Sequence, residues 1–246
     1  ANAKWLSDDT RHMLADLPPR PDQVTIAVNT NQMDVTALMD ADDIAGTSLT
    51  RPEMYEAYRN MHFECGPVFM EEHLKRLVAN GIQPHFMVGD MSQLETVERL
   101  IRKGHYNGPL VLNYVAIGSG AAGVHPADLV DFARRVPDGA VLTIETVMRN
   151  VAPFSAMAIA LGLHVRCGIE DNLWSRKGER MTSVQQVEQM VRIANELHRD
   201  VASGPEAKAI YQIGTFYQST DETLRKLGYP PNRQPGQRGV PRWEYA

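Results

Sequence analysis

The sequence predicts an α/β fold built from consecutive βα units. Short apolar segments of strand length recur along the chain, and each is followed by a turn and an amphipathic segment of roughly three helical turns. The later segments are spaced by about 25 to 30 residues, the size of one βα unit. Such runs with short connections form parallel sheets. The five expected strands are residues 24–29, 85–90, 109–115, 140–146 and 163–169.

Helices are expected after these strands because the intervening segments carry start and stop signals. Residues 7–17 read as a helix before the first strand. Ser92 and Glu95 match a capping box, and Gly104 follows the apolar stripe of that segment. Pro126 stands where a first helical residue would, and Ser183 opens the last helix of the repeat.

Polar residues at successive strand ends favour a TIM (β/α)8 barrel, of which this chain would supply about the last five βα units. A barrel gathers its chemistry at the carboxyl-terminal rim of its strands, whereas an open doubly wound sheet needs polar residues at only one or two strand ends. The residues concerned are Asn29, Thr30, Asp90, Asn113, Glu145, Glu170 and Asp171.

Two parts of the chain are expected, a partial barrel domain over residues 1–203 and a C-terminal extension over 204–246. The barrel part contains a long insertion, 31–66, whose aspartates lack the order of a calcium loop and indicate a solvated acidic loop. Residues 51–63 read as a helix that covers the barrel mouth or an interface. The extension is too polar to build its own core, so it should wrap a neighbouring subunit or hang free.

Composition excludes several classes of protein. The 246 residues are 43% hydrophobic with a net charge of −5, so no basic surface for nucleic acid or anionic membranes is implied. No apolar run approaches the roughly 20 residues that span a bilayer. Two lone cysteines, Cys65 and Cys167, indicate a reducing compartment, so the expected location is the cytoplasm.

The end of the last expected strand is the strongest candidate site. Side chains alternate along a strand, so Arg166, Gly168 and Glu170 should share one face, with Asp171 opening the next loop. A fixed cation beside two carboxylates suits a bound metal and a base held ionised by arginine. A plain ion pair between Arg166 and Glu170 is the alternative. Cys167 should point to the helices as a packing residue.

The residues His-Val-Arg-Cys-Gly-Ile-Glu-Asp-Asn, 164–172, resemble the closing strand of the β-keto acid cleavage enzymes. The resemblance extends from about residue 24 to 203 and includes Gly-Ile-Gln-Pro at 81–84 and, loosely, Arg-Pro-Glu-Met at 51–54. The family implies a TIM barrel with a divalent metal, usually zinc, in a dimer or tetramer. It also implies condensation of a β-keto acid with acetyl-CoA, which releases acetoacetate and a new CoA thioester.

Roles follow from this resemblance by position. Glu170 looks like a metal ligand, Asp171 like the general base, and Arg166 like the partner that keeps Asp171 ionised. Asn29 and Thr30 resemble contacts to the substrate carboxylate. Substrate contacts are also expected from further rim residues, namely Asn113, Glu145 and Met87.

Two departures from the family pattern qualify these roles. The family's His-x-His metal ligands occur nowhere here, and its first three strands would precede residue 1. Met87 stands where members that use amino-substituted keto acids have an acidic residue, so a neutral or apolar substrate is expected, unless Glu145 supplies the charge from the neighbouring strand end. A non-catalytic barrel subunit is therefore one alternative. Another metal-dependent aldol-type barrel is a second, disfavoured because no Gly-rich phosphate turn follows the last two strands.

Overall fold

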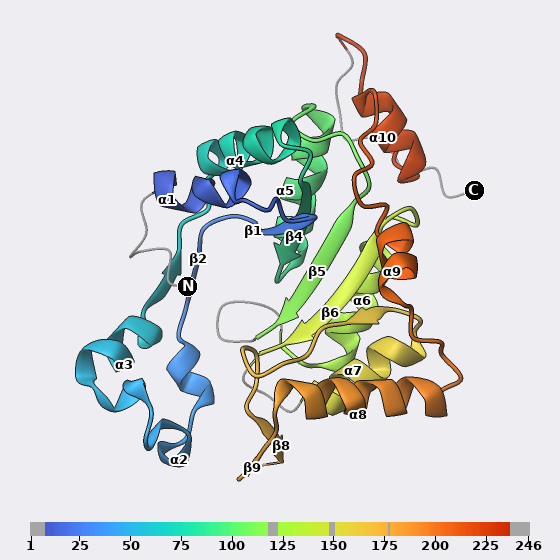
Figure 1. Ribbon diagram of the computed structural model, residues 1–246. Coiled ribbons are helices and arrows are strands. Elements are labelled where there is room, and N and C mark those ends of the chain that lie inside the picture. The colour runs from blue at the N-terminus through green and yellow to red at the C-terminus, as the bar shows by residue number, and fades with distance from the viewer. Residues whose placement is uncertain (1–7, 118–122, 148–150, 177, 237–246) are drawn as a thin grey trace.

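The computed structural model describes residues 8–117, 123–147, 151–176 and 178–236 (Figure 1). Its centre is a five-stranded parallel sheet with the order β1-β4-β5-β6-β7. These strands are β1 (Gln23–Ala27), β4 (Gln83–Val88), β5 (Val111–Ala116), β6 (Val141–Thr146) and β7 (His164–Val165). The α/β class and the five parallel strands are therefore confirmed. The described strands form an open sheet and do not close into a barrel.

The helices of the repeat follow the strands as expected. They are α4 (Pro67–Ala79), α5 (Met91–Arg102), α6 (Pro126–Arg135), α7 (Val151–Ala160) and α8 (Ser183–Glu196). Two caps differ from the sequence reading. Asp90 caps α5 by accepting from the Gln93 amide, and Thr182 caps α8 in a capping box with Gln185. In both cases the capping residue stands one or two residues upstream of the expected serine.

The sheet is apolar on the face that the helices cover. Phe86, Leu112 and Ile144, on three neighbouring strands, join one core with the apolar stripes of the helices. The helix residues of this core include Leu74 of α4, Val97 of α5, Phe132 of α6 and Phe154 of α7. All four helices therefore pack on the same face. The opposite face carries the alternate residues, many of them polar, and positions the candidate site.

Strand order separates two interpretations of the sheet. The sequence Gly-Ser-Gly-Ala-Ala-Gly, 118–123, fits the Gly-x-Gly-x-x-Gly pattern of dinucleotide-binding turns, and it follows β5. Residues 118–122 lie outside the described part. A doubly wound sheet reverses its strand order and carries helices on both faces. Here the order follows the chain without reversal, and α4, α5, α6 and α7 all pack on one face, which is a singly wound arrangement.

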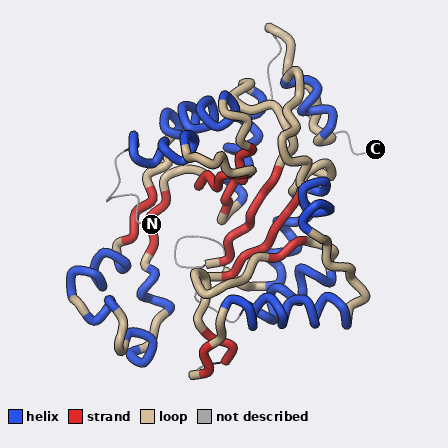
Figure 2. Tube along the Cα trace, viewed as in Figure 1, coloured by secondary structure: helices blue, strands red, loops and turns tan. Residues whose placement is uncertain are grey.

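The insertion forms an arm that extends from the body in Figures 1 and 2. Its base is the antiparallel pair β2 (Asn31–Met33) and β3 (Met61–Phe63). Between them lie η3 (Val35–Leu38), α2 (Ala41–Ile44), η4 (Ser48–Thr50) and α3 (Pro52–Arg59). The expectation of a plain acidic loop is wrong, because Asp34 and Asp40 cap the short helices that they precede. Capping is a common use of aspartate at such positions.

At the N-terminal side, α1 (Asp8–His12) and η2 (Met13–Asp16) pack on α4. A small hairpin, β8 (Trp174–Arg176) with β9 (Glu179–Arg180), precedes α8. No helix among the described residues is long and apolar enough to cross a membrane.

The C-terminal extension does not hang free in its described part, which ends at residue 236. It forms α9 (Gly204–Ile210) and α10 (Thr220–Lys226). Leu224, Leu227 and Tyr229 are buried in the main core together with residues of α5. The extension lacks a core of its own, as expected, but it completes the core of the body. Contact with a neighbouring subunit stays a prediction, and residues 237–246 lie outside the described part.

Candidate active site

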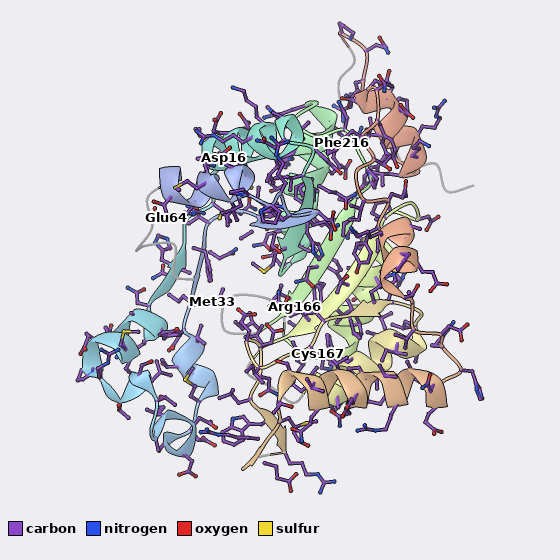
Figure 3. The ribbon with its side chains drawn as sticks, viewed as in Figure 1. Asp16, Met33, Glu64, Arg166, Cys167 and Phe216 are labelled. Carbon is purple, nitrogen blue, oxygen red and sulfur yellow. The ribbon has the colours of Figure 1, made fainter. Side chains whose placement is uncertain are left out.

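Arg166 is the centre of the candidate site, just past the end of β7. Its backbone amide donates to the carbonyl of Ile144 at 2.9 Å, which extends the pairing with β6 by one residue. Figure 3 labels Arg166 beside the carboxyl-terminal ends of β5 and β6. The site therefore lies at the rim where the sequence predicted it.

The last strand is shorter than expected. It spans two residues and stops before Gly168, whose carbonyl accepts from the amides of Asp171 and Asn172 at 3.2 and 3.1 Å. The chain therefore turns, so the expectation that Arg166, Gly168 and Glu170 share one strand face is wrong. The turn nevertheless brings both carboxylates back to Arg166.

One guanidinium contacts three carboxylates. Arg166 Nε and Nη2 donate to Asp171 Oδ2 and Oδ1 at 3.1 and 2.9 Å, a bidentate pair. Its Nη1 lies 3.2 Å from Oε2 of Glu145, on β6, and its Nη2 also donates to Glu170. Bidentate pairs fix orientation as well as charge. The simple Arg166–Glu170 ion pair is thus only one part of a larger cluster.

The three carboxylates differ in burial. Glu145 and Asp171 are each 3% exposed, whereas the side chain of Glu170 is 78% exposed. Burial, followed by the charge of Glu145, raises the pKa of Asp171 to about 8, although Arg166 acts in the opposite direction. Desolvation and the like charge of Glu145 thus oppose the ionised form of Asp171, whereas the two hydrogen bonds from Arg166 favour it, so the expectation that Arg166 keeps Asp171 ionised stays a prediction. A group with a pKa near neutrality can still accept and return a proton.

Asn113 joins the cluster from β5. It is 1% exposed, and its Nδ2 donates to Glu145. Its Oδ1 is buried and has no hydrogen-bond partner among the described residues. A buried acceptor of this kind is suited to a donor on a bound molecule. The structure thus brings together five of the residues singled out from the sequence, namely Asn113, Glu145, Arg166, Glu170 and Asp171.

The other predicted contacts lie elsewhere on the rim. Asn29, with a left-handed φ of 63°, donates to the Thr96 hydroxyl at 3.1 Å, and the Thr30 hydroxyl accepts from the Cys65 amide at 3.2 Å. These bonds tie the loop after β1 to α5 and to the end of the arm. No described hydrogen bond connects either residue to Arg166.

Met87 belongs to an apolar cluster beside the polar one. It packs against the buried core of Val35, Val115 and Ile117, against which the arm residues Met33, Tyr58 and Met61 also pack. Val115 and Glu145 are direct partners in the pairing of β5 with β6, so the apolar and charged clusters adjoin. Cys167 packs instead with Ile159 and Met190 on the helix side, as expected, and burial raises the pKa of its thiol.

Sequence reasoning missed Tyr211, which approaches the site strands from the C-terminal extension. Its hydroxyl lies 2.8 Å from the Thr143 hydroxyl, and its ring contacts those of His85 and His164. Thr143 and Tyr211 are 68 residues apart in sequence. No local pattern marks such a contact, so nothing in the sequence pointed to it.

The donor atoms of the cluster limit which metal it could bind. Carboxylate oxygens of Glu145, Glu170 and Asp171 all lie within 4.8 Å of one another, which makes this an acidic group that could hold a metal. Arg166, however, already bonds all three, and the group holds no histidine or cysteine. Catalytic zinc normally takes three protein ligands, often nitrogen or sulfur. The described residues therefore do not make a zinc site by themselves.

The chain is similar in sequence to several curated enzymes. The 3-keto-5-aminohexanoate cleavage enzyme of Acetoanaerobium sticklandii is 37% identical over 140 residues, which cover 56% of this chain and 51% of that enzyme. The 3,5-dioxohexanoate:acetyl-CoA acetone transferase of Paraburkholderia graminis is 30% identical over 141 residues, 55% of this chain and 45% of the relative. The 3-dehydrocarnitine:acetyl-CoA trimethylamine transferase of Rhizobium meliloti is 28% identical over 144 residues, which cover 57% of this chain and 46% of that relative.

The chain thus spans about half the length of the curated relatives it matches. A sequence model of one family, described as beta-keto acid cleavage enzyme, matches residues 3–213 and so covers every described element from α1 to α9. The chain belongs to the beta-keto acid cleavage enzyme family.

Proposed function

We propose that this protein cleaves a β-keto acid with acetyl-CoA, giving acetoacetate and a new acyl-CoA, at the cluster around Arg166. The observation that supports this most is the buried Asp171, held by two hydrogen bonds from Arg166 beside Glu145. The relatives' names include cleavage of 3-keto-5-aminohexanoate and transfers that use acetyl-CoA. A proton-accepting carboxylate at the strand rim is what such chemistry requires.

Asp171 acts as the general base in this proposal. Its raised pKa, about 8, lies close to working pH, where a base combines availability with driving force. Arg166 aims the carboxylate and balances its negative charge while Asp171 is ionised and ready to accept a proton from the substrate. The Oδ1 of Asn113 accepts a hydrogen bond from the substrate, and Glu145 holds Asn113 in place. Asn29 and Thr30 contact the substrate carboxylate from the neighbouring loop.

A divalent metal, zinc by family resemblance, belongs to the same proposal. Glu170 would be its ligand in this chain, because its exposed side chain is free to rotate away from Arg166. A bound metal would polarise the substrate's keto group as a Lewis acid. Its remaining ligands would come from outside the described residues, since this chain has no His-x-His.

The proposal also covers the barrel, the class of substrate, the oligomeric state and the location of the protein. The singly wound sheet, with helices on one face, is part of a TIM barrel whose other strands lie outside this chain. Met87 and its apolar neighbours favour a neutral or apolar substituent on the keto acid over a cationic one. The protein is a homo-oligomer of the cytoplasm.

The proposal is tested by acetoacetate formation from acetyl-CoA and a panel of β-keto acids with neutral, apolar and cationic substituents. We expect turnover to be fastest with the neutral or apolar acids. Asp171→Asn should lower kcat by about 100-fold or more, because loss of a positioned base costs this much. Asp200→Asn, at an exposed aspartate, is the matched control and should match the parent protein.

The second candidate is a barrel subunit without catalysis, favoured by the missing His-x-His pair. It predicts neither stoichiometric metal nor acetoacetate with any acid of the panel. Absence of turnover from the parent protein with added zinc would replace the enzymatic proposal with this one. Turnover that survives Asp171→Asn would instead remove Asp171 from its role as base.

A further inference from the structure

Tyr211 lies on the polar face of the sheet, opposite the packed helices. It follows α9, which lies beside the amino-terminal part of β6 in Figure 1. Its hydroxyl is 2.8 Å from the Thr143 hydroxyl. Its ring centroid is 5.6 Å from that of His164, on β7, and 6.4 Å from that of His85, on β4. One side chain therefore touches three strands of the sheet.

Thr143 and His164, which Tyr211 contacts, each precede a charged residue of the site by two positions. Thr143 and His164 are partners in the pairing of β6 with β7. Glu145 follows Thr143 by two residues in β6, and Arg166 follows His164 by two residues, just past the end of β7. Side chains two apart in an extended chain share a face. Tyr211 thus supports the layer immediately beneath the Glu145–Arg166 pair, whose charged atoms are 3.2 Å apart.

The segment around Tyr211 is itself fixed to the sheet. Gln83, which is fully buried on β4, donates through Nε2 to the carbonyl of Tyr211 at 2.9 Å. Gln83 also bonds the side chain of Gln23 on β1. The backbone of Tyr211 is therefore held by β4, while its hydroxyl and ring contact residues of β6 and β7.

We propose that Tyr211 is a positioning residue, which sets the separation of β6 and β7 beneath the Arg166 cluster. This inference rests on the proposed function in that the cluster is taken as the active site. Tyr211 acts through Thr143 and His164 and does not touch the carboxylates. Its effect is on how well Arg166 holds Asp171, so loss of Tyr211 should lower kcat more than it raises KM.

The direct test is the Arg166 Nε–H signal in ¹⁵N–¹H spectra of the full chain, assigned by its loss in Arg166→Lys. This group donates to buried Asp171, so in the parent protein it should exchange slowly with water. In Tyr211→Ala we expect the signal to move and its exchange to quicken by about tenfold, which corresponds to about 1.4 kcal/mol. Tyr211→Phe and Thr143→Val each remove one hydroxyl of the Thr143–Tyr211 hydrogen bond. Both variants should therefore change the Arg166 signal and its exchange rate by the same amount, which is smaller than in Tyr211→Ala.

Tyr217→Phe is the matched control. Tyr217 lies on the same segment and bonds Gln212, but its described contacts do not include β6 or β7. It should leave the Arg166 signal unchanged. If Tyr211→Ala does not fold, Tyr211→Phe and Thr143→Val decide the matter.

An Arg166 signal that is unaltered in the folded Tyr211 and Thr143 variants, or altered as much by Tyr217→Phe, overturns the positioning role. The readout does not depend on turnover. A parent protein without activity would therefore refute the proposed function, while the role of Tyr211 would still be decided by the Arg166 signal.

Discussion

At the scale of single residues, stability and chemistry around Arg166 depend on one guanidinium among three carboxylates. Arg166→Gln should destabilise the fold by about 3 kcal/mol at neutral pH, because it leaves the buried carboxylate of Glu145 without its cation and buried Asp171 without its two hydrogen-bond donors. Urea unfolding measures this loss. The double variant Arg166→Gln/Glu145→Gln should recover part of it, since one uncompensated charge is removed with its partner.

An exposed pair provides the control for this prediction. Arg134 and Asp131 lie on the surface of α6, with side chains 77% and 74% exposed. Arg134→Gln should change the free energy of unfolding by less than about 1 kcal/mol. Equal losses from Arg134→Gln and Arg166→Gln would show that the buried cluster adds nothing to stability.

The raised pKa of Asp171 predicts how stability depends on pH. The folded state keeps the proton of Asp171 up to about pH 8, whereas the unfolded chain releases it near the ordinary value of 3.8. The folded state therefore binds more protons in this window, so this group's contribution to stability falls as pH rises from 3.8 to 8. Asp171→Asn lacks that dependence.

Unfolding in chelator-containing buffer at about pH 5 and about pH 9 measures this effect as the stability of Asp171→Asn relative to the parent. The free energy of unfolding of Asp171→Asn, relative to that of the parent, should increase as pH rises. The reverse trend would mean that Arg166 outweighs burial and keeps Asp171 ionised, as first expected from the sequence. Asp200→Asn, at an exposed aspartate, should show no such trend.

At the scale of elements, the sequence predicted well what local signals determine. Apolar runs placed β4, β5 and β6 within two residues at each end, because the face of each strand that packs against the helices must be apolar. The carboxyl-terminal rim was also found, since its polar residues stand out directly after those runs. Extending β7 to residue 169 failed, because the turn that ends it depends on hydrogen bonds to the Gly168 carbonyl.

The docking of α1 on α4 depends on two buried histidines. Nδ1 of His12 lies 3.1 Å from Nδ1 of His73, and both rings are nearly inaccessible to solvent. Burial, with the charges of His12 and then Arg11, lowers the pKa of His73 to about 4. The unfolded chain, with an ordinary value of 6.5, binds more protons between these limits, so this contribution is present above pH 6.5 and lost toward pH 4.

Acid should therefore loosen α1 before the rest of the molecule. Hydrogen exchange at residues of α1 should quicken as pH is lowered from 6.5 toward 4, beyond the intrinsic change of the amides. His73→Gln should weaken this dependence, whereas His198→Asn, at an exposed left-handed position, should keep it. An acid dependence that is the same in both variants would exclude His73 as its source.

At the scale of the whole molecule, long-range contacts limited what the sequence could predict. The five candidate residues that meet at Arg166 were found because parallel strands bring their carboxyl ends to one edge. The packing of the C-terminal extension on the body was not predicted, because its few apolar residues cannot form a core alone. Those residues complete a core contributed by segments more than 100 residues upstream, as the Arg102–Pro230 bond shows.

This packing predicts that the extension unfolds together with the sheet. Leu224 is 1% exposed within the main core, so Leu224→Ala should cost about 2 to 5 kcal/mol and shift the global unfolding transition. Leu161→Ala, at a side chain 51% exposed, is the matched control and should cost less than about 1 kcal/mol. Urea unfolding followed by circular dichroism should show one transition for both variants. If Leu224→Ala instead gave an early transition and left the main midpoint unchanged, residues 204–236 would form a separate unit, because a shared core couples its elements into one cooperative transition.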